Sequence, residues 1–178
     1  MTVTRKSLDV GWKNLLAETL QLDRKFSDSD IKKLSSITEL DIAGHQITSL
    51  EPLRLLPQLE VLYISETSVC DLSPLEGLIN LRELHATFCC CEDLGLLANL
   101  HQLEVLDISY PKDPHADISF LAFLPNLKEL YCNGFKFSSI KEIAQLSELE
   151  ILSLHFTNIN GEDLKHIRTI LPECHVLF

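Results

Sequence analysis

Residues 59–80, LEVLYISETSVCDLSPLEGLIN, carry the pattern that decides the fold. The preceding stretch, 37–58, reads ITELDIAGHQITSLEPLRLLPQ, and the following one, 81–102, reads LRELHATFCCCEDLGLLANLHQ. All three stretches are 22 residues long and space their apolar residues in nearly the same way. Self-similarity at such a period is typical of proteins in which repeated units stack and bury a continuous core. The sequence therefore predicts a stacked array.

Each repeat opens with the pattern of a short strand that has one buried face. Apolar residues occupy the first, fourth and sixth positions, and polar or aromatic residues alternate with them. The first positions are Ile37, Leu59, Leu81, Leu103, Leu127 and Leu149. We expect six parallel strands of about four residues each, and a seventh strand at residues 175–177. Pro52 and Pro74 indicate tight convex segments in which a long helix does not fit.

Residues 1–36 precede the repeats and are expected to form an N-terminal helical cap, because the first repeat of an array leaves its core open. The residues spaced as one helical face are Val10, Trp12, Leu15, Leu16, Leu20 and Leu22. Residues 37–178 are expected to form the solenoid, continuous with the cap in one structural domain. The fourth repeat has 24 residues, and its PKDPHA segment (111–116) predicts a bulging loop. The last repeat contains GEDLKHIRTILPEC, which predicts a convex helix capped near Asn160.

The chain is acidic, with 26 Asp and Glu against 15 Lys and Arg and a formal net charge of -11 in 178 residues. Such a surface repels nucleic-acid phosphates and anionic lipids, so we expect neither nucleic acid nor a membrane as partner, and a basic protein surface instead. The N-terminal stretch has no apolar run of signal-peptide length, and no segment approaches the roughly 20 apolar residues of a membrane helix. We expect a cytoplasmic location, where the six cysteines do not form disulfides.

The repeats resemble those of leucine-rich repeat proteins. Residues 59–80 match the pattern L-x-x-L-x-I-x-x-T-x-V-x-D-L-x-P-L-x-x-L-x-N, which is similar to the short 22-residue repeats of internalins and of the protein phosphatase 1 regulatory subunit. The last repeat resembles the helix-bearing repeats of ribonuclease-inhibitor-like proteins. The resemblance implies an α/β right-handed solenoid, with a concave parallel sheet of about seven short strands and helical caps at both ends. It also implies protein binding as the function.

The third, fifth, seventh and eighth positions of the repeats are expected to face the concave side, and acids occupy the third position in Glu39, Glu83 and Glu129. The fifth positions are Asp41, Tyr63, His85, Asp107, Tyr131 and Ser153, and the seventh positions include Thr87, Ser109 and His155. The eighth positions are Gly44, Glu66, Phe88, Tyr110, Gly134 and Phe156. Exposed aromatic residues among acids are typical of interaction surfaces, although a flat sheet also accepts aromatic residues as cross-strand packing. The predicted partner-binding residues are Tyr63, Glu66, His85, Phe88, Asp107, Tyr110, Tyr131, His155 and Phe156.

The cysteines resemble a metal cluster at first sight, because Cys89, Cys90 and Cys91 are consecutive and Cys70 lies one repeat away. The repeat register instead places Cys89, Cys91, Cys132 and Cys174 at turn or core positions, where cysteine packs as a small hydrophobic residue. Zinc sites prefer cysteine pairs with two to four residues between them, so that two sulfurs converge, whereas neighbouring cysteines in an extended run diverge. We therefore predict no metal and no cofactor, with only Cys70 and Cys90 exposed.

His85 and Asp107 are predicted neighbours in one column, as in half of a catalytic triad, and Ser109 and Thr87 share their face. A flat sheet supplies no nucleophile turn, oxyanion donors or deep pocket, so we predict no enzymatic activity. The favoured function is binding of a basic protein, by an immunity-type inhibitor or a regulatory subunit that is monomeric by itself. The alternatives are an enzyme using the concave His, Asp and Tyr side chains, or a purely structural scaffold.

Overall fold

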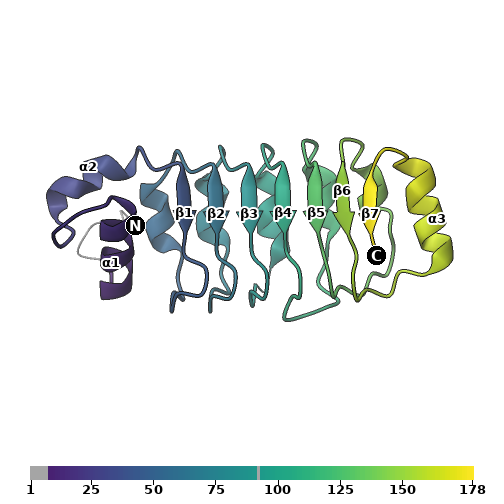
Figure 1. The fold of residues 1–178 in the computed structure, drawn as a ribbon, viewed down its shortest axis with the longest axis horizontal. Coiled ribbons are helices and arrows are strands. Elements are labelled where there is room, and N and C mark those ends of the chain that lie inside the picture. Colours follow the sequence, from purple (N-terminus) through teal and green to yellow (C-terminus); the bar gives the residue numbers. More distant parts are fainter. Residues whose placement is uncertain (1–7, 92) are drawn as a thin grey trace.

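The computed structural model describes residues 8–91 and 93–178. These residues form one parallel sheet whose strands follow the chain order, from β1 to β7, with the connecting segments behind them (Figure 1). The strands are β1 (Glu39–Asp41), β2 (Val61–Tyr63), β3 (Glu83–His85), β4 (Val105–Asp107), β5 (Glu129–Tyr131), β6 (Ile151–Ser153) and β7 (His175–Leu177). The predicted leucine-rich repeat solenoid with seven short parallel strands is thus confirmed. Each strand has three residues rather than about four.

The strands pair in the register that the repeat period predicts. Leu40 pairs with Leu62, and Leu62 pairs with Leu84, so each buried leucine lies beside the equivalent leucine of the next repeat. β4 and β5 keep this register, with Leu106 opposite Leu130, although two extra residues separate them. The extra residues are accommodated in the loop that follows β4, which projects beyond the other turns in Figure 1.

Short 3-10 segments, rather than long helices, carry the chain back along the convex side. They span Glu51–Leu55, Ser73–Gly77, Leu94–Asn99, Ser119–Phe123 and Ile143–Gln145. Pro52 and Pro74 stand in the first turn of their segments, where a residue without an N–H group loses no hydrogen bond. Leu53 and Leu75 follow these prolines and are fully buried.

The N-terminal end of the sheet is covered by α1 (Val10–Thr19) and α2 (Ile31–Leu34) (Figure 1). Asp9 caps α1 by accepting a hydrogen bond from the backbone N–H of Trp12. The Trp12 side chain is buried, and its Nε1–H donates to the carbonyl oxygen of Ser49 at 3.0 Å. Val10 was expected on the same buried face, but it is 72% exposed, because the first residue of α1 points to solvent. Residues 1–7 of the predicted cap lie outside the described residues.

The C-terminal end carries the predicted helix α3 (Gly161–Ile170). Asn160 caps it by accepting hydrogen bonds from the N–H groups of Glu162 and Asp163, and Asp163 in turn accepts from the N–H of Asn160. Ile167 packs into the core from this helix. None of the helices in the described ranges is long and apolar enough to cross a membrane.

Candidate functional site

The exposed, concave face of the sheet, here called the sheet face, presents the predicted fifth-position column. Tyr63, His85, Asp107 and Tyr131 lie side by side on β2 to β5, because the strand register aligns them. The rings of Tyr63 and His85 are stacked, with centroids 4.6 Å apart and planes inclined by 9°. His85 Nε2 lies 3.8 Å from a carboxylate oxygen of Glu83. The column is therefore an ordered surface of half-buried aromatic and acidic side chains.

The surroundings of the two tyrosines of this column raise the pKa of both phenols. The Tyr131 hydroxyl donates a 2.8 Å hydrogen bond to Glu129, which raises the pKa of Tyr131 to about 12. Partial burial, followed by the charge of Glu83, raises the pKa of Tyr63. Both phenols are therefore available as hydrogen-bond donors at neutral pH.

Asp107 does not hold His85 as the carboxylate of a triad holds its histidine. Its carboxylate accepts a 2.8 Å hydrogen bond from the Thr87 hydroxyl and a 2.9 Å bond from the Ser109 N–H. Within the described part of the chain, no hydrogen bond joins His85 to Asp107, although the two residues are register partners. Asp107 therefore holds Thr87 and Ser109 in place and does not form a proton relay with His85.

Two positions expected on the sheet face are buried instead. Ser109 and Ser153 are each 2% exposed, because both are covered by a network centred on Asn133. The Asn133 amide donates to Ser109 Oγ at 3.1 Å and accepts from Ser153 Oγ at 2.8 Å. Asn133 also accepts a 2.8 Å bond from the backbone N–H of His155. This network fixes the turns of the last repeats in place.

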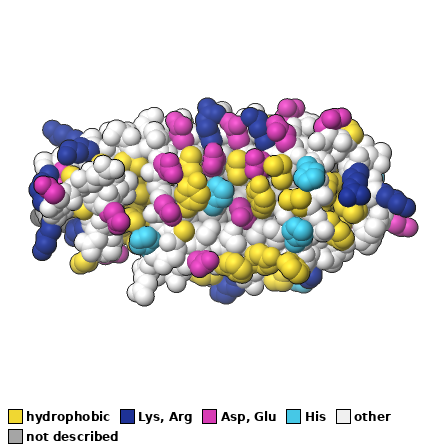
Figure 2. Space-filling model, viewed as in Figure 1, with side chains coloured by type: hydrophobic (Ala, Val, Ile, Leu, Met, Phe, Trp, Pro, Cys, Tyr) yellow, Lys and Arg dark blue, Asp and Glu magenta, His cyan; other side chains and the backbone are white. Residues whose placement is uncertain are grey.

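The eighth positions form a ridge of aromatic rings along the edge of the sheet face, at the C-terminal ends of the strands. The aromatic ridge consists of Phe88, Tyr110 and Phe156. The rings of Phe88 and Tyr110 are stacked at 4.8 Å, and those of Tyr110 and Phe156 are 6.3 Å apart. Phe88 is 56% exposed and Phe156 77%. Figure 2 shows hydrophobic side chains gathered along this lower edge of the face.

All three ridge residues have the left-handed backbone conformation that favours glycine. Their φ angles are 57°, 54° and 61° for Phe88, Tyr110 and Phe156. Gly44 and Gly134 occupy the equivalent positions with φ of 68° and 80°. The hydrogen-bond ladder imposes this turn, since the Phe88 N–H donates to the Ser109 carbonyl of the next repeat at 3.0 Å. A bulky side chain in this conformation costs about 1–3 kcal/mol.

Sequence reasoning missed this strain, although a signal for it was present. Gly44 and Gly134 share a column with the three aromatic residues and Glu66, and a glycine that recurs at a turn position indicates a positive φ. Glu66 shows the same conformation, with φ of 58°. The column therefore carries side chains that the backbone disfavours, and most of them are aromatic.

Among the described residues, no Lys or Arg forms an ion pair with an acid of the sheet face, whereas Glu104 at its upper edge is paired. Glu104 bridges Arg82 and Lys128, and the hydrogen bond from Lys128 is the larger cause of the lowered pKa of Glu104. The described acids on or beside the sheet face are Glu39, Asp41, Glu66, Glu83, Asp107 and Glu129. In Figure 2, acidic side chains are spread across the face above the hydrophobic edge. The surface thus combines aromatic rings with net negative charge.

The cysteines are distributed mostly as the repeat register predicts. Cys89, Cys132 and Cys174 are buried, while Cys70 and Cys90 are half-buried. Cys91 was expected in the core but is also half-buried, packed against its edge. Among the described residues, no group of three or more His, Cys, Asp or Glu side chains is arranged to hold a metal ion.

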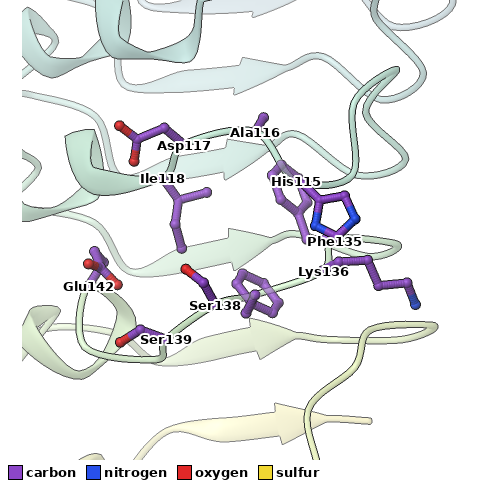
Figure 3. Close-up of a pocket in the computed structure, with 10 residues that line it drawn as sticks. His115, Ala116, Asp117, Ile118, Phe135, Lys136, Ser138, Ser139 and Glu142 are labelled. Carbon is purple, nitrogen blue, oxygen red and sulfur yellow. The ribbon is translucent and has the colours of Figure 1, made fainter.

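A shallow polar pocket of about 250 Å³ lies between the loop after β4 and the fifth repeat. Figure 3 shows the carboxylates of Asp117 and Glu142 on one side and His115 on the other, with Lys136 extending away. The pocket is bordered by the loop that accommodates the two extra residues of the fourth repeat. Its side chains do not converge on one point, so it defines no reactive site.

Comparison with solved structures shows the same fold in bacterial proteins. An internalin, InlF, from Listeria monocytogenes superposes with a TM-score of 0.76 at 24% identity, covering 95% of this chain and 55% of the internalin. A leucine-rich repeat protein from Leptospira interrogans gives 0.71 at 25% identity, covering 85% of this chain and 40% of that one. Internalin C2 from L. monocytogenes gives 0.61 at 19% identity, with 94% and 92% covered.

No protein-family model matches the sequence, and no curated protein matches it either. The chain spans about half the length of the first two solved structures. The architecture is that of a leucine-rich repeat protein, structurally similar to the Listeria internalins. Leucine-rich repeat domains are typically protein-binding modules, built as extended surfaces by stacking repeats.

Proposed function

We propose that this protein is a non-enzymatic module that binds a basic protein through the sheet face and the aromatic ridge. The observation that carries the proposal is the placement of three aromatic side chains, the exposed Phe88 and Phe156 and the half-buried Tyr110, where the backbone favours glycine. A strained conformation of this kind is retained where the side chain has a use that folding alone does not supply. Exposed aromatic rings supply binding energy, because they bury much area at little cost in conformational entropy.

The dimensions of the sheet face support this function. Neighbouring strands lie about 4.8 Å apart, so seven strands span roughly 29 Å. A standard interface buries about 800 Å² on each partner, which a face of this length accommodates. The acids on and beside the sheet face favour a partner of opposite charge. The short repeats and the convex helix α3 fit a solenoid of the internalin type with a last repeat of the ribonuclease-inhibitor type.

Two roles are compatible with such a module. An immunity-type inhibitor would block a basic toxin or enzyme by covering its active surface, and a regulatory subunit would hold its partner without abolishing activity. We favour a cytoplasmic location for either role, as expected from the sequence. The alternative function, an enzyme that uses His85 and Asp107, is disfavoured because the Asp107 carboxylate accepts hydrogen bonds from Thr87 and Ser109 instead.

The test compares capture of partners by the wild-type chain and by a Phe88→Gly/Phe156→Gly variant. Glycine suits the backbone at both positions, so the variant loses the rings without losing the fold. Phe123→Ala is the matched control, because Phe123 is 58% exposed in a convex segment. We expect a basic protein in stoichiometric amounts on the wild type and the control, and its loss from the ridge variant. Equal capture by all three chains would contradict the proposal.

The activity of the captured partner then distinguishes an inhibitor from a regulatory subunit. Activity of the captured protein, assayed with and without this chain, falls to background for an inhibitor and persists for a regulatory subunit. His85→Ala and Asp107→Ala variants address the enzymatic alternative, since loss of a measurable turnover in both would favour catalysis.

A further inference from the structure

The turns that follow β2 and β3 bring two cysteines together. Cys70 and Cys90 belong to adjacent repeats, and the Cys70 thiol points at Cys90 with the two Sγ atoms 3.0 Å apart. Cys70 also lies 3.8 Å from the carbonyl oxygen of Ser68. The pair exists only because the repeats stack, since 20 residues separate the two cysteines along the chain. Neither the sheet nor the core requires sulfur at these positions.

We propose that Cys70 and Cys90 form a reversible disulfide that links the turns of the second and third repeats, with a small disulfide of the glutathione class as oxidant. The thiolate of one cysteine attacks the small disulfide and releases one reduced thiol, which leaves a mixed disulfide on the protein. The thiolate of the other cysteine then attacks the protein sulfur of the mixed disulfide and releases a second reduced thiol. The two cysteine protons end on the two released thiols.

The geometry suits this reaction. A disulfide has an S–S bond of about 2.05 Å, so the two sulfurs have to approach by about 1 Å, a movement within reach of exposed turns. Cys70 and Cys90 are half-buried and thus accessible to a small oxidant. Cys132 and Cys174 are buried, and burial raises the pKa of both thiols, so they remain reduced under the same conditions.

Cys89 is the competing thiol. A hydrogen bond with Cys91 lowers the pKa of Cys89 to about 7, which favours the reactive thiolate. Cys89 is buried, however, and its Sγ points to the carbonyl oxygen of Ile64 at 3.0 Å. Cys89 faces the core rather than Cys70, so Cys90 is the partner of Cys70 in the disulfide.

The disulfide would act on the aromatic ridge without being part of it. Cys90 follows Phe88 by two residues, so the linkage ties the turn that carries Phe88 to the second repeat. Formation of this disulfide is independent of the proposed function, because the linkage is detected by mass rather than by binding.

Tryptic peptide mapping after incubation with excess oxidised glutathione tests the proposal. Cleavage after Arg54, Arg82 and Lys112 gives peptide 55–82, in which Cys70 is the only cysteine, and peptide 83–112, which holds Cys89 to Cys91. We expect the two peptides to be joined, with a mass lower than their sum by two hydrogen atoms, and to separate after treatment with dithiothreitol.

Single variants identify the second sulfur. We expect the joined peptide to disappear in Cys90→Ser and to persist in Cys89→Ser and Cys91→Ser. Persistence in Cys90→Ser, failure of the wild type to form the joined peptide, or its formation only between two chains on a non-reducing gel would each overturn the proposal. Unfolded wild-type protein serves as the control, and equal yields from folded and unfolded chains would also count against it.

Discussion

The ring of Phe88 stacks on the ring of Tyr110 across two adjacent repeats, with centroids 4.8 Å apart and planes inclined by 9°. Tyr110 in turn lies over Gly134, where an added Cβ would stand 3.1 Å from the tyrosine ring. Phe156 follows on the next repeat. The rings of the third, fourth and sixth repeats and Gly134 of the fifth repeat therefore lie in one continuous row. The contribution of these residues to stability can be measured without knowing the partner.

Phe156→Gly should increase the free energy of unfolding by about 1 kcal/mol, because glycine adopts the left-handed conformation without strain. The ring is 77% exposed, so little packing is lost. Urea denaturation followed by circular dichroism measures the change. Phe156→Ala is the matched control, since alanine keeps the Cβ and the strain. A glycine variant no more stable than the alanine variant would show that the turn is not strained.

Gly134→Ala should lower the free energy of unfolding by about 1–2 kcal/mol, since φ of 80° is unfavourable for alanine. The new methyl group would also press on the Tyr110 ring. Gly77→Ala is the control, because open space surrounds that position, and its effect should stay within about 0.5 kcal/mol. Similar unfolding curves for the two variants would argue against the close approach of Tyr110.

Trp12→Phe should destabilise the protein by about 1–3 kcal/mol, because it removes the indole hydrogen bond to the Ser49 carbonyl and leaves a smaller ring in a buried site. The loss should appear first at the N-terminal end, as faster amide hydrogen exchange in α1 and β1. Thr19→Ala, which removes a partly buried hydroxyl from the same helix, is the comparison. Uniformly faster exchange along all seven strands would contradict a local capping role.

Asp30 should make stability depend on pH in the acid range. The hydrogen bonds from Arg24 and Ser27 hold the pKa of Asp30 far below its ordinary value of 3.8, and Asp30 is fully buried. A group with a depressed pKa stabilises the fold above its unfolded-state pKa, and this contribution is lost progressively as the pH falls below that value.

Asp30→Asn should therefore be less stable than the wild type at pH 7, and the difference should shrink as the pH falls below 3.8. Thermal unfolding across a pH series measures it. Lys33→Gln is the control, because Lys33 lies 3.5 Å from Asp30 but is largely exposed. A difference that stays constant down to the lowest pH would contradict the ion pair as its cause.

Binding of the partner should weaken as the ionic strength rises, because acids border the aromatic ridge and the charges are screened by salt. Titration calorimetry at low and high ionic strength measures the change in Kd. Glu83→Gln and Glu129→Gln should each reduce the salt dependence, whereas Glu148→Gln, an exposed residue just after the convex segment of the fifth repeat, should not. A Kd that is independent of salt would argue against a basic partner.

Much of this architecture could be predicted from the sequence, because the burial pattern assigned to one repeat applies to every other repeat. Once Leu62 is assigned inward by the alternation of its strand, Leu40 and Leu84 must follow in the same column. The place of Tyr63, His85 and Tyr131 on the sheet face follows from the same register. Val10 was misassigned because it belongs to no repeat and its helical spacing alone did not fix which side faces the core.

The sequence by itself thus determined the solenoid, the strand order, the register and the column to which each side chain belongs. Only the tertiary structure determined the hydrogen-bond partner of each polar side chain. Asp107 accepts a hydrogen bond from Thr87 and makes none with His85, and Ser153 is buried against Asn133. The tertiary structure also decided the approach of Cys70 to Cys90. The physical reason is that periodic burial of apolar area is set by residue spacing, whereas hydrogen bonds and sulfur contacts depend on rotamers and on the exact stacking of neighbouring turns.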